Sequence, residues 1–282
     1  MGFLFLFVVI LAITATALIA KLASRKSITA LDLSTSLFGV SAVIGAVILY
    51  DQLPVKVTAQ AVLFSAVAGI GGSLAVLAFN RAIRTGHFGI SNAIYRSSFL
   101  VPVVYAVLFL HSPLKFTTSG GILCILAGIF FMSRSTAPFA AEQHPDSRWL
   151  CLILLAFLLS GAPRVGQTLT NLCNENDYLY LFLSYFVGAV ILVGITLQRG
   201  TFNPASLTWG TGAAVASYIG VFCTLKALEV LNPHVVFPIS LTGPIILGIL
   251  LSLFFFREKI TRQGWLGISF GIAGILILAI WK

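Results

Sequence analysis

Apolar runs of about 20 residues recur along this chain and restrict its fold more than any other feature. The first run, GFLFLFVVILAITATALIA, starts at Gly2 and contains no charged residue. An α-helix rises about 1.5 Å per residue, so a run of this length crosses the hydrocarbon core of a bilayer. The runs lack the polar–apolar alternation of membrane-barrel strands. We therefore predict an all-α integral membrane protein with ten spans, at about residues 2–22, 31–50, 59–83, 87–110, 118–134, 149–172, 178–197, 207–228, 234–256 and 263–281.

The composition excludes several other classes of protein. Of the 282 residues, 59% are hydrophobic and 9% are charged, whereas about a quarter of the residues in a soluble domain are charged. The net charge of +9 comes from basic residues in short connectors, so we expect a lipid bilayer as partner and no nucleic acid. The four cysteines stand singly, without CxxC spacing, so no metal and no cofactor is expected. We expect a multi-pass protein of a bacterial inner or plasma membrane; its oligomeric state is left open, and a monomer is one option.

The basic residues also predict an orientation. Lys21, Arg25 and Lys26 follow the first run and no basic residue precedes it, which indicates a retained span rather than a secretory signal. The connectors after the odd-numbered spans hold most of the other basic residues: Arg81, Arg84, Arg134, Arg148, Arg199, Arg257, Lys259 and Arg262. Under the positive-inside rule these connectors are cytoplasmic, which places both termini outside the cytoplasm.

The chain contains an internal repeat. LKFTTSGGILCILAGIFFM, from Leu114, aligns with EKITRQGWLGISFGIAGILIL, from Glu258, at an offset of about 144 to 146 residues. We therefore predict a first five-helix repeat at 1–134, a connecting loop at 135–147 and a second repeat at 148–282. Because five is an odd number, the two halves insert with opposite orientation. Inverted repeats are a common device of transporters.

Arg96 is the charged residue that most needs an explanation, because it lies near the middle of the fourth span. An arginine at a helix centre costs about 2.5–3.5 kcal/mol on insertion scales, so it is not expected to face lipid. Tyr95 is its neighbour and Asn92 lies one turn away. One hypothesis is a solute-binding site made by these three residues. The alternative is a structural arginine that bonds the backbone carbonyls of a broken helix.

A second arginine, Arg164, lies in LLSGAPRVGQTLTNL of the sixth span. Pro163 removes a backbone donor and loosens the helix, which is tolerated at membrane depth where a cavity or protein lies beside it. Arg164 and Gln167 are therefore candidates for the cavity lining. The alternative is that Arg164 lies close enough to the helix end to reach the membrane surface.

Four further residues of the second half are structural or coupling candidates. Lys226 and Glu229 are three residues apart in LKALEVLNP, a spacing that favours an ion pair. Pro238 and Pro244 interrupt the ninth span, where they can expose backbone groups or simply bend the helix. The glycines of the last span, Gly264, Gly267, Gly271 and Gly274, are expected to pack against another helix.

The positions of the acidic residues indicate the charge of the solute. Of the eight, all except Glu229 lie in or beside connectors: Asp32, Asp51, Glu142, Asp146, Glu175, Asp177 and Glu258. A carrier for cations usually has a carboxylate in its cavity, whereas the spans here carry arginines, which bind carboxylate or phosphate. No HExxH or GxSxG motif is present, so we expect a protein that is not an enzyme.

Ten spans in two halves, the tail FFFREKITRQGWLGISFGIAGILIL and the alanine of LKALEVLNP 17 residues before Pro244 resemble the EamA-like branch of the drug/metabolite transporter (DMT) superfamily. The resemblance covers essentially the whole chain. It implies a ten-helix carrier for metabolites, with a central cavity between the halves and both termini in the cytoplasm, contrary to the charge bias. It places Glu258 on the acidic residue before the last helix, with a structural role; Ser112 and Pro113 stand at that place in the first half.

We therefore expect a secondary transporter that moves a small anionic or zwitterionic metabolite, such as an amino acid, an organic acid or a sugar phosphate, by alternating access. The alternative within the same fold is an exporter of amphipathic or aromatic compounds. A remote alternative is an integral membrane enzyme or a scaffold.

Overall fold

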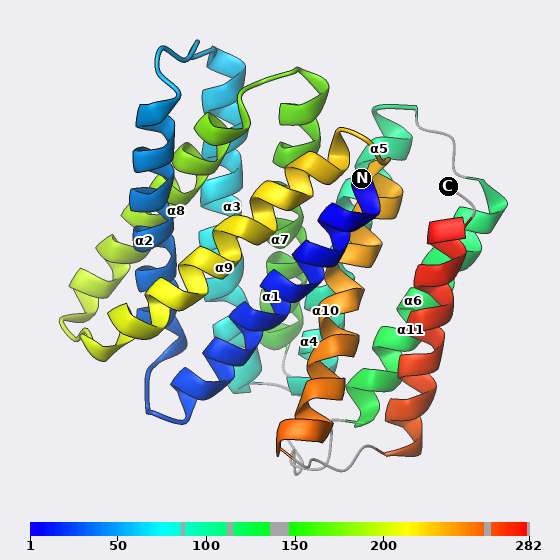
Figure 1. Cartoon of the computed structure of the whole chain (residues 1–282). Helices are drawn as coiled ribbons and strands as arrows, with labels where there is room; N and C mark the ends of the chain where they lie inside the picture. Colours follow the sequence, from blue (N-terminus) through cyan, green and yellow to red (C-terminus); the bar gives the residue numbers. More distant parts are fainter. Residues whose placement is uncertain (86–87, 112–114, 136–146, 257–260, 281–282) are drawn as a thin grey trace. The chain divides into compact units, whose positions relative to one another are not determined.

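The computed structural model describes residues 1–85, 88–111, 115–135, 147–256 and 261–280. The regular structure of these residues is helical, and Figure 1 shows the course of the chain. The elements are α1 (Gly2–Ser24), α2 (Ala30–Asp51), α3 (Ala59–Thr85), α4 (Phe88–Arg96), the 3₁₀-helix η1 (Ser97–Phe99), α5 (Leu100–Leu108), α6 (Phe116–Ser135), α7 (Ser147–Leu172), α8 (Asp177–Arg199), α9 (Ala205–Leu228), α10 (Pro233–Phe256) and α11 (Arg262–Ile280).

The predicted all-α membrane fold is confirmed. Within the described residues, nine helices are long and apolar enough to cross a bilayer, and their ends lie within about two residues of the predicted spans. The fourth predicted span, 87–110, is divided into α4, η1 and α5. Pro102 lies in the first turn of α5 and cannot donate to the carbonyl of Ser98 four residues earlier, which explains why the helix changes its pitch at this place.

The helices gather into two compact units, which are described separately. Unit 1 comprises Met1–Val76 and Ala162–Val230, and unit 2 comprises Leu77–Gly161 and Leu231–Lys282. Each unit thus combines segments from both halves of the sequence. The repeat at 1–134 and 148–282 is a relation within the sequence, and it stays a prediction.

In unit 1, α2 packs against α8 and α9, and α1 packs against α9. Thr35 near the start of α2 shares a 2.9 Å hydrogen bond with Thr196 near the end of α8, and a Cβ on Gly45 of α2 would lie 3.0 Å from the Cα of Phe182 on α8. These contacts show that α2 and α8 are antiparallel. Tyr180, Leu181 and Leu225 are almost fully buried in the core beside them.

In unit 2, α6 and α11 lie side by side along their lengths (Figure 1). A Cβ on Gly128 of α6 would lie 2.8 Å from the backbone nitrogen of Gly271, and one on Gly274 would lie 2.7 Å from the carbonyl oxygen of Gly121. The glycines of the last helix therefore pack against another helix, as predicted. Small residues at such a contact let two backbones approach closely inside a membrane.

Candidate functional site

Arg96 is the last residue of α4, immediately before η1. Its Nε is buried and has no hydrogen-bond partner among the described residues. The hydroxyl of Ser98, two residues further on, is also buried and has no hydrogen-bond partner among the described residues. Ser98 is 1% exposed. Buried polar atoms in proteins are nearly always hydrogen-bonded to protein, water or a ligand. A cation and a hydroxyl at a change of helical pitch therefore provide two groups that can bind a solute.

Helix α10 contacts both η1 and α5 within unit 2. It carries two further buried atoms that have no hydrogen-bond partner in the described part of the chain, Nδ1 of His234 and Oγ1 of Thr242. Thr242 lies between Pro238 and Pro244, and α10 continues as a helix through both prolines. In the described part of unit 2, the buried polar atoms without a partner thus belong to α4, η1 and α10.

The other two predicted members of this site lie on α4 with Arg96. The ring of Tyr95 packs on Phe79 with a centroid distance of 4.5 Å, beside a buried cluster around Trp149 and Ile153. Asn92 is half-buried. At a spacing of three and four residues, Asn92, Tyr95 and Arg96 share one side of the helix. Their joint role in binding stays a prediction.

Arg164 and Gln167 lie in unit 1, on the second half of α7. Gln167 is buried at 6% exposure. The hydroxyl of Tyr180 donates a 2.7 Å hydrogen bond to the carbonyl of Pro163, which ties α8 to α7 at the proline. Since Arg96 belongs to unit 2, the structure describes the two arginines in separate units, and a shared cavity stays a prediction.

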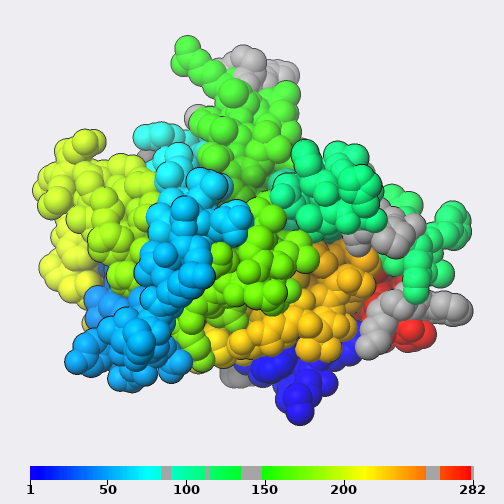
Figure 2. All heavy atoms as spheres, turned by 90° about the horizontal axis from the view of Figure 1, so that it is seen from above, coloured from blue at the N-terminus to red at the C-terminus, as the bar shows by residue number. Residues whose placement is uncertain are grey.

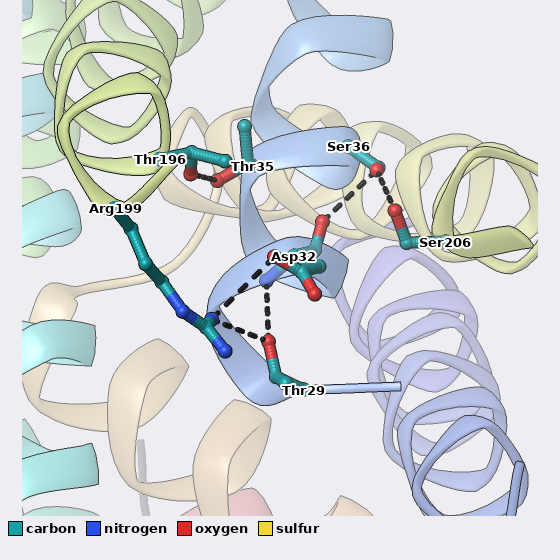
Figure 3. Close-up of polar contacts among 7 residues, drawn as sticks. All are labelled: Thr29, Asp32, Thr35, Ser36, Thr196, Arg199 and Ser206. Carbon is teal, nitrogen blue, oxygen red and sulfur yellow. Dashed lines mark hydrogen bonds and ion pairs between the residues drawn. The ribbon is translucent and has the colours of Figure 1, made fainter. Parts of the chain in front are cut away.

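A buried carboxylate in unit 1 has no counterpart in the prediction from sequence (Figure 3). Asp32 is 2% exposed although it lies in the first turn of α2. Nη1 of Arg199, at the end of α8, lies 3.7 Å from its Oδ1 and donates to Oγ1 of Thr29 over 3.3 Å. Deeper in α2, Ser36 shares a 2.9 Å hydrogen bond with Ser206 of α9. Asp32 is buried because the end of α8 and the first turn of α9 cover the start of α2.

Unit 1 has a pocket of about 290 Å³ where α7 ends, α8 begins and α9 ends. Figure 2 looks toward this end of the unit, where the turn after α2 and the connection between α7 and α8 face the viewer. Lys226 lies in the pocket wall, 2.9 Å from Oδ2 of Asp177, and its Nζ also pairs with Oε1 of Glu229. The lining residues are Asn171, Asn174, Glu175, Asn176, Asp177, Tyr178, Lys226 and Glu229.

The three-residue spacing of Lys226 and Glu229 indicated their pairing from the sequence, whereas Asp177 is 49 residues away from Lys226 in the chain. One feature of the sequence, not used in the prediction, relates Asp177 to Asp32. Asp32 and Asp177 are separated by 145 residues, which is the offset of the internal repeat. Each lies in the first turn of its helix. Glu258, the remaining predicted residue, lies outside the described residues.

Comparisons with known proteins give the family. Residues 147–280 match the model of the EamA-like transporter family. This half of the chain belongs to the EamA-like transporter family. The resemblance to the DMT superfamily is thereby confirmed. Of the predicted residues, Arg164, Gln167, Lys226 and Glu229 lie inside the EamA-like half, whereas Arg96 lies outside the matched range.

A relative and a solved structure are also similar to this chain. An uncharacterised protein of Haemophilus influenzae is 24% identical over 197 residues, which are 67% of this chain and 65% of that protein. The chain thus matches about two thirds of the length of its relative. A chain in a solved crystal structure, described only as a protein, has a TM-score of 0.77 at 11% identity over 99% of both chains. That likeness shows the fold alone.

Proposed function

We propose that this chain is a secondary transporter of the DMT type that moves a small solute bearing a carboxylate or phosphate, free or as part of a zwitterion. The observation that carries the proposal is the buried Nε of Arg96, which has no hydrogen-bond partner among the described residues. A buried guanidinium without a counter-charge is costly. A solute anion removes that cost by accepting two parallel hydrogen bonds from it.

The surroundings of Arg96 support a binding role over a purely structural one. A structural arginine would donate to the backbone carbonyls of a neighbouring helix, and no such bond is present among the described residues. Ser98 adds a hydroxyl that can donate to the same anion. A short 3₁₀ segment inside a helix is also a frequent site of hinge motion, which alternating access requires.

The charge pattern supports a topology with both termini outside the cytoplasm, in an inner or plasma membrane. Lys26, Arg134 and Arg199 are among the basic residues of the connectors after odd-numbered spans. Labelling of a cysteine added at either terminus with a membrane-impermeant reagent tests this orientation, and labelling from the cytoplasmic side alone contradicts it.

Uptake by proteoliposomes tests the role of Arg96. Native protein and Arg96→Gln are compared on a panel of labelled amino acids, organic acids, sugar phosphates and aromatic amines. We expect one acidic or zwitterionic solute to be taken up, and Arg96→Gln to slow its uptake about 10- to 100-fold, because a charge-assisted hydrogen bond is lost. Arg96→Lys keeps the charge but not the two-pronged geometry, so it should retain an intermediate rate.

The matched control is Arg148→Gln, which removes the same charge at an exposed position of unit 2 and should leave uptake unchanged. Equal uptake by the native protein and a folded Arg96→Gln variant would make Arg96 structural. Uptake of aromatic amines alone would favour the exporter of amphipathic compounds instead.

A further inference from the structure

The pocket at the ends of α7 and α9 is lined by three carboxylates, and in each of them one oxygen has a described partner. Glu175 accepts a 2.7 Å hydrogen bond from Thr58 at Oε1. Asp177 and Glu229 each pair with Lys226 through one oxygen, Oδ2 and Oε1 respectively. For each of these three carboxylates, the described contacts engage one oxygen and leave the other as an acceptor. The side chain of Asp177 is nine-tenths buried, so this charge is held in the wall rather than in open water.

The single lysine of the lining does not neutralise this wall. Lys226 is bound to two of the carboxylates, and its Nζ lies 5.7 Å above the ring of Phe222. Three carboxylates against one ammonium leave the pocket with an excess of negative charge. Asn171, Asn174 and Asn176 add carboxamides that can accept or donate. An anion would meet repulsion here, and an apolar molecule would meet few apolar walls.

The size of the pocket and the spacing of its carboxylates favour an organic cation over a metal ion. The described residues contain no group of three or more His, Cys, Asp or Glu side chains placed to hold a metal ion, and the two carboxylates that lie close together, Asp177 and Glu229, already share the ammonium of Lys226. At about 290 Å³ the pocket lies at the lower end of the range for small-molecule sites, roughly 300–1,000 Å³. A flexible organic cation can span separated carboxylates, and each primary ammonium carries three hydrogen-bond donors.

From these contacts we propose that the pocket is a binding site for a short aliphatic amine, best matched by a molecule with two ammonium groups. Glu175 and Glu229 bind the ammonium groups, while Lys226 holds Asp177 and Glu229 in place. The site lies wholly within unit 1 and is separate from Arg96. It therefore does not depend on the class of solute proposed for transport.

Direct binding to the full chain in lipid nanodiscs tests this site without any measurement of flux. The probes are 1,4-diaminobutane, 4-aminobutanoate, butanoate and Mg²⁺, titrated by calorimetry at equal, low ionic strength. We expect 1,4-diaminobutane to bind most tightly and butanoate not to bind. Glu175→Gln and Glu229→Gln should each weaken diamine binding about tenfold, because each removes one charge partner and keeps the shape of the side chain.

The control is Asp51→Asn, which changes the net charge equally at an exposed residue that does not line the pocket, and which should bind the diamine as the native protein does. If Glu229→Gln does not yield folded protein, Glu175→Gln provides the same comparison at a lining carboxylate that accepts from Thr58 rather than from Lys226. Absence of diamine binding, equal binding by all variants, or tighter binding of Mg²⁺ or butanoate than of the diamine overturns the proposal.

Discussion

Asp32 and Arg199 form an ion pair whose two members lie in different surroundings. The carboxylate is 3% exposed, whereas the guanidinium of Arg199 is 43% exposed and remains hydrated. The positive end of the α2 dipole also favours the charge of Asp32. Removal of Arg199 therefore leaves a buried carboxylate with less compensation, whereas removal of the charge on Asp32 leaves an arginine that water can solvate.

This asymmetry predicts the result of a double-mutant cycle. Arg199→Ala should lower the free energy of unfolding by about 1–2 kcal/mol, a value between those of exposed and buried pairs. Asp32→Asn should cost less, and the double variant should be more stable than Arg199→Ala alone because the uncompensated charge is gone. Unfolding in mixed micelles of SDS and dodecylmaltoside measures all four proteins. Additive losses would show that the two side chains are not coupled.

At the scale of elements, the contact between α6 and α11 depends on glycine. Gly128 lies against the backbone of Gly267 and Gly271, so a Cβ there would come within 3 Å of backbone atoms that cannot move independently. Gly120 lies on the same helix, and a Cβ there would have no atom within 4 Å. The two positions form a natural comparison, because both are helical glycines of α6 and they differ in what surrounds them.

Gly128→Ala should destabilise the protein by about 1–3 kcal/mol, since the two helices must move apart. Gly120→Ala should be neutral or stabilising by up to about 1 kcal/mol, because alanine favours a helix over glycine. The same unfolding assay distinguishes them. Equal stability of the two variants would mean that α6 and α11 are not in close contact in the membrane.

The helices could be predicted from the sequence because the length and apolar composition of a segment are sufficient to identify a span. The packing role of the glycines of α11 followed from their spacing for a similar reason. The partners of the helices could not be predicted, because the packing of α2 on α8 depends on which apolar faces meet in space. Ion pairs were subject to the same limit. The pairing of Lys226 with Glu229 could be predicted because the two residues are three apart in the sequence. The pairs Lys226–Asp177 and Arg199–Asp32 join residues far apart in the sequence, so only the fold shows them.

The break after Arg96 shows both the strength and the limit of prediction from sequence. The arginine itself stood out as a charge within an apolar run. The absence of a described partner for Nε could be known only from the structure, because it depends on every element packed around α4. The sequence thus singled out the residue, and the structure adds the buried Nε without a described partner on which the proposed solute site rests.

At the scale of the whole molecule, the EamA-like second half supports a carrier, and the internal repeat predicted from the sequence would supply two related halves that exchange roles across the membrane. Such a carrier exposes its solute site to one side at a time. Solute on the far side should therefore speed the return of the empty site and drive exchange, which neither a channel nor a scaffold can do.

Tracer counterflow tests this account most directly. Proteoliposomes loaded with unlabelled amino acids, organic acids and sugar phosphates are diluted into a trace of each labelled solute. We predict that the native protein accumulates at least one acidic or zwitterionic solute transiently above its equilibrium level. Arg96→Gln and protein-free liposomes should show no such overshoot. Absence of an overshoot with the native protein, or an overshoot that Arg96→Gln leaves unchanged, would contradict the account.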